Sequence, residues 1–270
     1  MRSAIKAVVL DWAGTMIDYG SRAPVVALQR LFEQAGVAIS EAEARADMGR
    51  AKRDHIRAIL AIPRVSEVWL EKYGASAGDG DVEKMHDAVA PIMREAARDC
   101  SDLIPGAAEL AIELRKRGVP IGSCTGYTRE MMADILPRAA AQGYTPDVVI
   151  CSGDTPEGRP TPLMLWKAFI ELGVWPAWVC VKVDDATVGI LEGKAAGSWT
   201  VGIAASGNGV GVTLEELEAL SGGERTQRIG AAKAILHAVG ADYVIESVAD
   251  LAPILDQIET RIEAGEKPSA

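Results

Sequence analysis

The sequence predicts an α/β fold: a doubly wound, Rossmann-like parallel sheet with an inserted helical cap domain. Two observations lead to this prediction. Short apolar runs rich in β-branched residues alternate with helical patterns, which is typical of a parallel sheet covered by helices on both faces. One long helical block interrupts this alternation, and a chain of 270 residues is long enough to bury a core in each of two domains.

The expected strands are short apolar runs separated by amphipathic segments. They are predicted at residues 4–10, 119–124, 148–151, 178–183, 200–203 and 243–245. Helical patterns lie between them, at residues 107–117, 129–141, 161–172 and 190–196. Sheets of this kind bind ligands at the carboxyl ends of their strands, so functional residues are expected there.

The stretch from residue 23 to residue 100 contains no convincing strand pattern. Helical patterns recur at 24–34, 40–46, 52–60 and 81–98, and Ser40 and Glu43 have the spacing of a capping box. This block is too large for a crossover between strands. We therefore interpret residues 21–100 as a cap domain, with hinges near Gly20 and 102–106, and residues 1–20 with 101–270 as the core domain.

Composition excludes several function classes. The 38 acidic residues exceed the 28 Lys and Arg, and the formal charge of −10 argues against non-specific nucleic-acid binding. No apolar run approaches the roughly 18 residues that span a membrane, and no signal peptide is recognised. The four cysteines form no CxxC pair, so a reduced, cytoplasmic protein is expected. The run 207–211 lacks the spacing of a nucleotide-binding loop and is interpreted as a flexible loop, and residues 265–270 are expected to fray.

A carboxylate directly follows the first predicted strand, in the run Asp11-Trp12-Ala13-Gly14-Thr15. It could act as a nucleophile, bind a metal ion, or simply cap a loop. Gly14 and Thr15 suit a turn whose backbone N–H groups face an anion.

This run resembles the nucleophile motif of the haloacid dehalogenase superfamily. Most phosphatases of that superfamily have a second Asp, a general acid for the leaving alkoxide, where this chain has Ala13. A carbon leaving group instead needs an electron sink, and the motif with Ala is similar to that of the phosphonoacetaldehyde hydrolase family, which cleaves a P–C bond. Residues 18–24 also resemble that family, which often has Cys in place of Ser21; the resemblance implies Ser21 as a polar substrate contact.

In the cap, Met48, Lys52 and His55 would share one face of a helix. A lone Lys-x-x-His is usually a solvated helix end, but the whole run 48–57 resembles the cap motif of the same family. That resemblance implies that Lys52 forms an imine with an aldehyde, that His55 transfers a proton or donates a hydrogen bond nearby, and that Met48 contacts the substrate. The imine would supply the electron sink.

Two further runs suit phosphate binding. Residues 121–130 lead from a strand into a helix, whose N-terminal N–H groups can bind an anion. The resemblance to the superfamily's second motif implies Thr125 and Gly126 as phosphate contacts, with Tyr127 near the substrate. Residues 158–162 resemble the third motif, in which Arg159 would donate two parallel hydrogen bonds to phosphate oxygens.

Asp184 and Asp185 follow another predicted strand, where paired carboxylates could be solvated or could bind Mg²⁺ through hard oxygen ligands. The run resembles the superfamily's fourth motif, commonly G-D-T-x-x-D. Asp184 stands at the Gly position and Gly189 at the distal Asp position. The resemblance implies that Mg²⁺ binds to Asp11, the carbonyl of Ala13 and Asp185, with Asp184 as a further candidate.

Together these motifs imply hydrolysis of phosphonoacetaldehyde to acetaldehyde and phosphate, a step in the degradation of 2-aminoethylphosphonate. Lys52 would form the imine, and Asp11 would attack phosphorus to give an aspartyl phosphate. Two alternatives stay open: a phosphatase or phosphomutase of the same superfamily acting on a small phosphate ester, and a non-catalytic phosphate-binding relative. The resemblance also implies a homodimer formed through the cap, and a small phosphonate as the only other partner.

Overall fold

The computed structural model describes residues 3–46 and 52–269. The chain divides into two compact units, one of residues 1–22 and 100–270 and the other of residues 23–99. Ser21, Arg22 and Cys100 thus belong to the first unit, whereas the sequence-based boundaries assigned Ser21, Arg22 and Cys100 to the cap.

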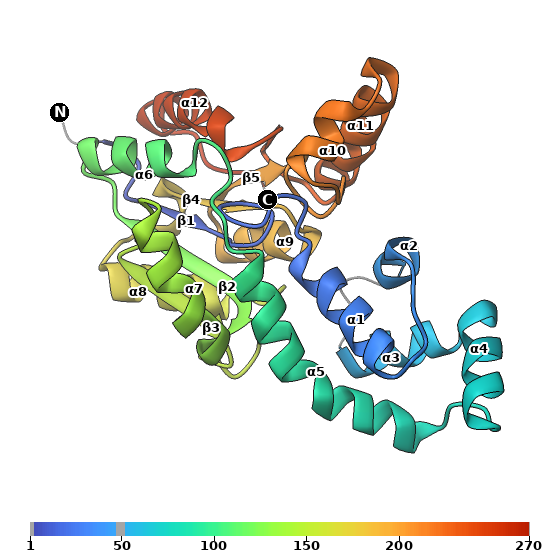
Figure 1. The fold of residues 1–270 in the computed structure, drawn as a ribbon. Helices are drawn as coiled ribbons and strands as arrows, with labels where there is room; N and C mark the ends of the chain where they lie inside the picture. The colour runs from blue at the N-terminus through green and yellow to red at the C-terminus, as the bar shows by residue number, and fades with distance from the viewer. Residues whose placement is uncertain (1–2, 47–51, 270) are drawn as a thin grey trace. The chain divides into compact units, whose positions relative to one another are not determined.

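The first unit contains a six-stranded parallel sheet in the order β3-β2-β1-β4-β5-β6 (Figure 1). Its strands are β1 (Ala7–Leu10), β2 (Ile121–Thr128), β3 (Val148–Ser152), β4 (Cys180–Asp184), β5 (Trp199–Ile203) and β6 (Tyr243–Ile245). Every residue of β1, β4 and β5 is buried, as continuous apolar runs predict for a sheet covered on both faces. The predicted doubly wound sheet is confirmed.

Strand order reverses at β1, because the chain builds β2 and β3 on one side of it and later β4, β5 and β6 on the other. The switch point therefore lies between β1 and β4, where open α/β sheets bind their ligands. Helices α8 (Leu163–Leu172) and α9 (Thr187–Ala196) contact each other on one face of the sheet, and α6 (Ala107–Lys116) contacts α12 (Leu251–Glu263) on the other (Figure 1). Helix α7 (Arg129–Ala141) connects β2 with β3.

The connection from β5 to β6 contains α10 (Leu214–Ala219) and α11 (Gly222–Ala238), which bury an apolar cluster against Ile190 of α9. The tail beyond α12, which was expected to fray, is instead hydrogen-bonded to the loop before β6. The backbone N–H and the hydroxyl of Ser269 donate to Asp242 Oδ1 over 3.0 and 2.7 Å.

The described part of the second unit consists of helices and the loops that connect them, without a strand. It contains α1 (Ala23–Gln34), α2 (Glu41–Arg45), α3 (Lys52–Leu60), α4 (Pro63–Tyr73) and α5 (Asp79–Asp99). Helix α5 packs against α1 and α3, and the capping box of Ser40 and Glu43 is present as predicted. Helix α4 was not predicted, although a proline in its first turn and Gly74 in left-handed conformation mark its two ends. Among the described residues, no helix is long and apolar enough to cross a membrane.

Candidate active site

The turn after β1 holds Asp11 at the switch point. The Asp11 N–H donates to the carbonyl of Val183 in β4 over 3.0 Å, which fixes the aspartate between the two central strands. The next residue, Trp12, is fully buried, donates from its indole N–H to Ser123 Oγ and packs edge-on against Tyr144. This anchored tryptophan explains why an apolar residue follows the aspartate, since it ties the turn to the core.

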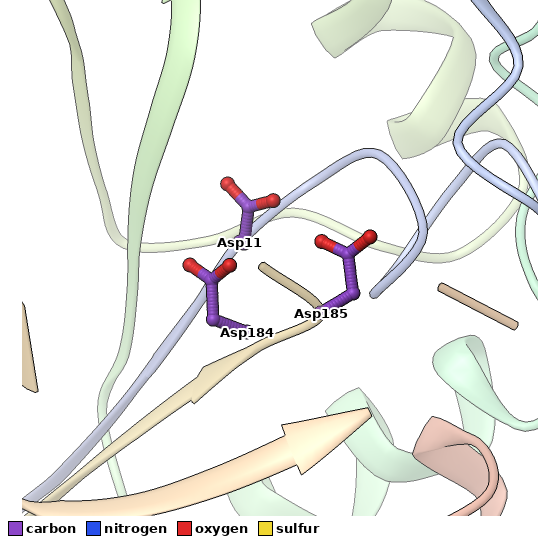
Figure 2. Close-up of side chains that lie close together, drawn as sticks. All are labelled: Asp11, Asp184 and Asp185. Carbon is purple, nitrogen blue, oxygen red and sulfur yellow. The ribbon is translucent and has the colours of Figure 1, made fainter. Parts of the chain in front are cut away.

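Three carboxylates meet beside this turn. Asp11, Asp184 and Asp185 each have an oxygen within 4.8 Å of the others, and Figure 2 shows the three side chains pointing the same way from the ends of β1 and β4. All three are buried. The sequence predicted these residues as metal ligands, and the structure brings their side chains together.

Burial and mutual repulsion disfavour the ionised carboxylates. Burial and, to a smaller extent, the nearby Asp184 raise the pKa of Asp11 to about 6, against the opposing effect of Arg159. Burial and the charge of Asp11 raise the pKa of Asp185 well above its usual range. A divalent cation among the three groups would offset this repulsion, and carboxylate oxygens are the ligands that Mg²⁺ prefers. The residues present therefore fit a metal ion.

Arg159 lies directly beside the acidic cluster. Its Nη2 donates to Asp11 Oδ1 over 2.6 Å and to the Cys124 carbonyl over 3.1 Å, and its Nη1 donates to Asp184 Oδ2 over 3.0 Å. The guanidinium therefore bridges two of the three carboxylates and also reaches the middle of β2.

The carboxyl-terminal half of β2 carries the three predicted phosphate and substrate contacts. Leu10 pairs with Ser123, so Asp11 and Thr125 leave neighbouring strands at the same edge of the sheet. The Thr125 hydroxyl accepts the N–H of Tyr127 over 3.1 Å, while a side chain at Gly126 would meet no atom within 4 Å. The backbone at Gly126 is therefore open to a close-approaching ligand.

The missing distal Asp of the fourth motif has a structural explanation. A Cβ added to Gly189 would overlap the Asp184 carboxylate, so the Asp184 side chain occupies the space that a side chain at 189 would need. Asp184 Oδ1 also accepts the N–H of Ala186 over 2.9 Å. A carboxylate therefore still lies in this part of the site, but it belongs to residue 184 and not to residue 189.

The glycine-containing segment after β5 is a loop, as expected, and it also contributes to the site, which the sequence did not predict. The Asn208 N–H donates to Asp185 Oδ2 over 2.7 Å, and the Ser206 hydroxyl donates to the Gly14 carbonyl over 2.9 Å. A Cβ on Gly207 would lie 2.6 Å from Asp185 Cβ. The position of this glycine at the carboxyl end of a strand was the signal that could have identified it.

The sequence reasoning also missed two buried charges, Lys182 in β4 and Glu192 in α9. Both are fully buried, and the Lys182 Nζ lies 3.0 Å from Asp184 Oδ2. A lysine between two valines in a continuous apolar strand was the available signal, because buried charges require partners.

The remaining predicted residues divide between the two units. Lys52 begins α3, and burial lowers its pKa to about 8. His55 lies one turn later on the same helix and is fully buried. Ser21 belongs to the first unit and has a φ of 50°, with its N–H donating to the Asp18 carbonyl over 2.8 Å. Met48 lies outside the described residues.

An aspartate at the switch point, an arginine bridging two carboxylates and an acidic cluster that fits a cation define a hydrolase site. The chain belongs to the haloacid dehalogenase-like hydrolases, whose family model matches residues 5–197. The resemblance found in the sequence motifs is thereby confirmed at the level of the superfamily.

Individual relatives have a more specific name. The chain is 50% identical over 264 residues to the phosphonoacetaldehyde hydrolase of Paraburkholderia phytofirmans, covering 98% of this chain and 99% of the relative. It is 45% identical to the phosphonoacetaldehyde hydrolase of Hahella chejuensis, covering 99% and 91%. The crystal structure of a phosphonoacetaldehyde hydrolase-like protein from Oleispira antarctica superposes with a TM-score of 0.87 at 42% identity, covering 99% and 98% of the two chains.

Proposed function

We propose that this hydrolase cleaves the P–C bond of phosphonoacetaldehyde and releases acetaldehyde and phosphate, as a step in 2-aminoethylphosphonate degradation. The observation that carries the proposal is the 50% identity over nearly the whole chain to a phosphonoacetaldehyde hydrolase. Ala13 supports it, because a phosphatase of this superfamily would have its general acid at that position.

Lys52 is the residue proposed to activate the aldehyde. Its amine must be neutral to attack a carbonyl carbon, and burial lowers its pKa to about 8. The Lys52 Nζ forms a bond to the aldehyde carbon and water leaves, which gives a protonated imine. This imine accepts the electron pair of the breaking P–C bond and becomes an enamine.

Asp11 is proposed to attack phosphorus while that bond breaks. The product is an aspartyl phosphate, which water then hydrolyses to phosphate and the free carboxylate. Arg159, hydrogen-bonded to Asp11, would offset the negative charge that accumulates between the nucleophile and the phosphoryl group. His55 would protonate the enamine carbon, after which water releases acetaldehyde from Lys52.

Phosphoryl oxygens would be bound by the Thr125 hydroxyl and the Gly126 N–H, with Tyr127 beside the substrate. Burial, together with the nearby Asp18 carboxylate, raises the pKa of Tyr127 well above its usual range, so its phenol stays a hydrogen-bond donor. Ser21 and Met48 are proposed as further substrate contacts.

Mg²⁺ is the proposed cofactor, bound by Asp11, Asp185 and the Ala13 carbonyl, with Asp184 as a further candidate. The three buried carboxylates support a divalent cation there. When bound, Mg²⁺ would offset the negative charges of Asp11 and the phosphoryl group so that the two can approach each other.

Residues 23–99 are proposed to act as the cap domain that carries Lys52 and His55, and to form a homodimer through cap helices. Support for an interface comes from Leu70 and Tyr73 on α4, whose exposed fractions are 48% and 50%. Trp69 of the same helix is 5% exposed and belongs to the core of the unit. A cytoplasmic location is proposed with the rest of the function.

The test is acetaldehyde release from phosphonoacetaldehyde by the purified protein with Mg²⁺. Asp11→Asn and Lys52→Arg should each lower kcat by about 10³-fold or more, because each removes a covalent step. Asp87→Asn and Lys84→Arg, at exposed positions of α5, are the matched controls and should retain wild-type turnover. Cleavage of small phosphate esters without acetaldehyde release would instead favour the phosphatase.

A further inference from the structure

Beneath the acidic cluster, two carboxylates and two cations form a closed ring. Lys182 Nζ lies 3.0 Å from Asp184 Oδ2 and 3.4 Å from Glu192 Oε2. Arg159 contacts the same two oxygens, with its Nη1 3.0 Å from Asp184 Oδ2 and its Nε 3.8 Å from Glu192 Oε2. The four formal charges of the ring cancel.

One arm of Arg159 extends from this ring toward the nucleophile. Its Nη2 lies 2.6 Å from Asp11 Oδ1, while the other two nitrogens of the guanidinium face Asp184 and Glu192. Because the guanidinium is planar and rigid, ion pairs at Nη1 and Nε determine where Nη2 points. The ring therefore controls the direction of the group that contacts Asp11.

Helix α9 leaves room for this arrangement at two glycines one turn apart. A side chain at Gly189 would overlap the Asp184 carboxylate. At Gly193 an added Cβ would lie 3.0 Å from Lys182 Cβ and 2.6 Å from Thr200 Cγ2. The two glycines therefore leave free the space that the Asp184 carboxylate and the stem of Lys182 occupy.

Lys182 also differs in charge state from the proposed imine lysine. Burial alone would lower the pKa of Lys182, but the attraction of Asp184 and Glu192 outweighs burial and raises it. Two carboxylates thus lie within 3.4 Å of the Lys182 Nζ, whereas burial lowers the pKa of Lys52. The chain thus uses one buried lysine as a charge and another as a nucleophile.

We propose that Lys182 and Glu192 are positioning residues that act through Asp184 and Arg159 to keep the Arg159 Nη2 on Asp11. Without Lys182, the two carboxylates of the ring have only Arg159 to balance them. The guanidinium is then drawn down toward both carboxylates and away from the nucleophile. The expected effect of these residues on turnover rests on the proposed function. Their expected effect on phosphate binding can be measured separately.

The rival explanation is that Lys182 and Glu192 only neutralise each other in the core. The variants Lys182→Met and Glu192→Gln, singly and together, separate the two explanations. Each single variant leaves an uncompensated buried charge and should lower the melting temperature, whereas the double variant should recover most of that loss. We expect the recovered double variant still to show kcat lower by about tenfold and a Kd for inorganic phosphate, with Mg²⁺ present, higher by about tenfold, because Arg159 Nε has then lost the Glu192 carboxylate and Asp184 has lost Lys182.

The exposed pair of Lys167 and Glu171 in α8, 2.8 Å apart, provides the matched control. The double variant Lys167→Met/Glu171→Gln should leave kcat, phosphate affinity and melting temperature unchanged. A Lys182→Met/Glu192→Gln double variant that recovers wild-type kcat and phosphate affinity together with its melting temperature would overturn the proposal. If Lys182→Met and the double variant do not fold, the isosteric Glu192→Gln alone decides: kcat and phosphate affinity within about twofold of wild type overturn the proposal, and losses of about tenfold support it.

Wild-type protein that binds phosphate but releases no acetaldehyde would contradict the proposed function alone. In that case the phosphate affinities of the same variants still test whether Lys182 and Glu192 position Arg159. Failure of the two proposals therefore gives different results.

Discussion

Glycines make room for charged side chains at several points of the site. Side chains at Gly14 and Gly189 would overlap the carboxylates of Asp185 and Asp184. A buried charge needs an accurately placed partner, and an additional methyl group would displace it from that partner. At the scale of single residues, the site therefore depends as much on the absence of side chains as on the carboxylates themselves.

Gly189→Ala tests this dependence. The added methyl group must displace Asp184 or α9, so we expect a loss of about 1–3 kcal/mol in the free energy of unfolding and an Mg²⁺ affinity weaker by about tenfold. Thermal unfolding and calorimetric titration with Mg²⁺ measure the two effects. The control is Gly230→Ala in α11, where an added Cβ meets nothing within 4 Å and should stabilise the helix by about 0.5–1 kcal/mol. An unchanged Mg²⁺ affinity in Gly189→Ala would show that Asp184 has room to move.

The lowered pKa of Lys52 predicts the pH dependence of imine formation. A lysine with a pKa of about 8 has roughly 300 times more neutral amine at pH 7 than one with the ordinary value of 10.5. Protonation removes the nucleophile, so the rate of imine formation should rise with pH and level off above about pH 8. Borohydride trapping of the adduct in short reactions between about pH 6 and 9.5 measures this rate, with Lys52→Arg as the blank. A rate still rising about tenfold per pH unit at the upper limit would contradict the lowered pKa.

At the scale of elements, the segment after β5 acts as a support for the turn after β1 and for Asp185. It hydrogen-bonds to both through Ser206 and Asn208. Gly207→Ala should push against Asp185 and weaken Mg²⁺ binding, because the added Cβ would lie 2.6 Å from Asp185 Cβ. Gly209→Ala is the control in the same loop, since its Cβ would lie 2.9 Å from Ala232 Cβ instead. Both variants should unfold at lower temperature, but only Gly207→Ala should raise the Kd for Mg²⁺; equal values for the two would contradict a supporting role.

The elements that the sequence predicts well are those in which one kind of local signal dominates. The apolar runs of β1 and β4 identified central strands because both of their faces are buried. Helix α4 was missed because its core contacts come mainly from two buried residues, Val65 and Trp69, too few for a clear periodic pattern. The ion ring was also missed, since Arg159 and Lys182 are far apart in the chain and only the fold makes them neighbours.

In the site too, residues marked by a local sequence signal were predicted, and contacts that only the fold creates were not. Asp11, Asp184, Asp185 and Arg159 each follow a strand or a turn that the sequence identifies, and the parallel sheet brings those ends together. Nothing local in the sequence indicates that Asp184 fills the space beside Gly189. Whether the Asp184 carboxylate can occupy the place of a side chain at 189 depends on the distance between β4 and α9, which packing determines.

At the scale of the whole molecule, the proposed chemistry divides between the two compact units. The electron sink, Lys52, belongs to residues 23–99, whereas Asp11, Arg159 and the acidic cluster belong to residues 1–22 and 100–270. Each unit has its own packed core, so a substitution in one should leave the local chemistry of the other intact. The two halves of the reaction should therefore be separable by mutation.

The expected result is a reciprocal pair of losses. Lys52→Arg should release no acetaldehyde yet bind Mg²⁺ and inorganic phosphate with Kd values within about twofold of wild type, because neither ligand needs the amine. Asp11→Asn should also release no acetaldehyde, but borohydride with phosphonoacetaldehyde should still leave a mass adduct on Lys52, because imine formation precedes attack on phosphorus. If Lys52→Arg loses phosphate affinity, or if Asp11→Asn traps no adduct, the two steps are not independent and the proposed order of bond formation is wrong.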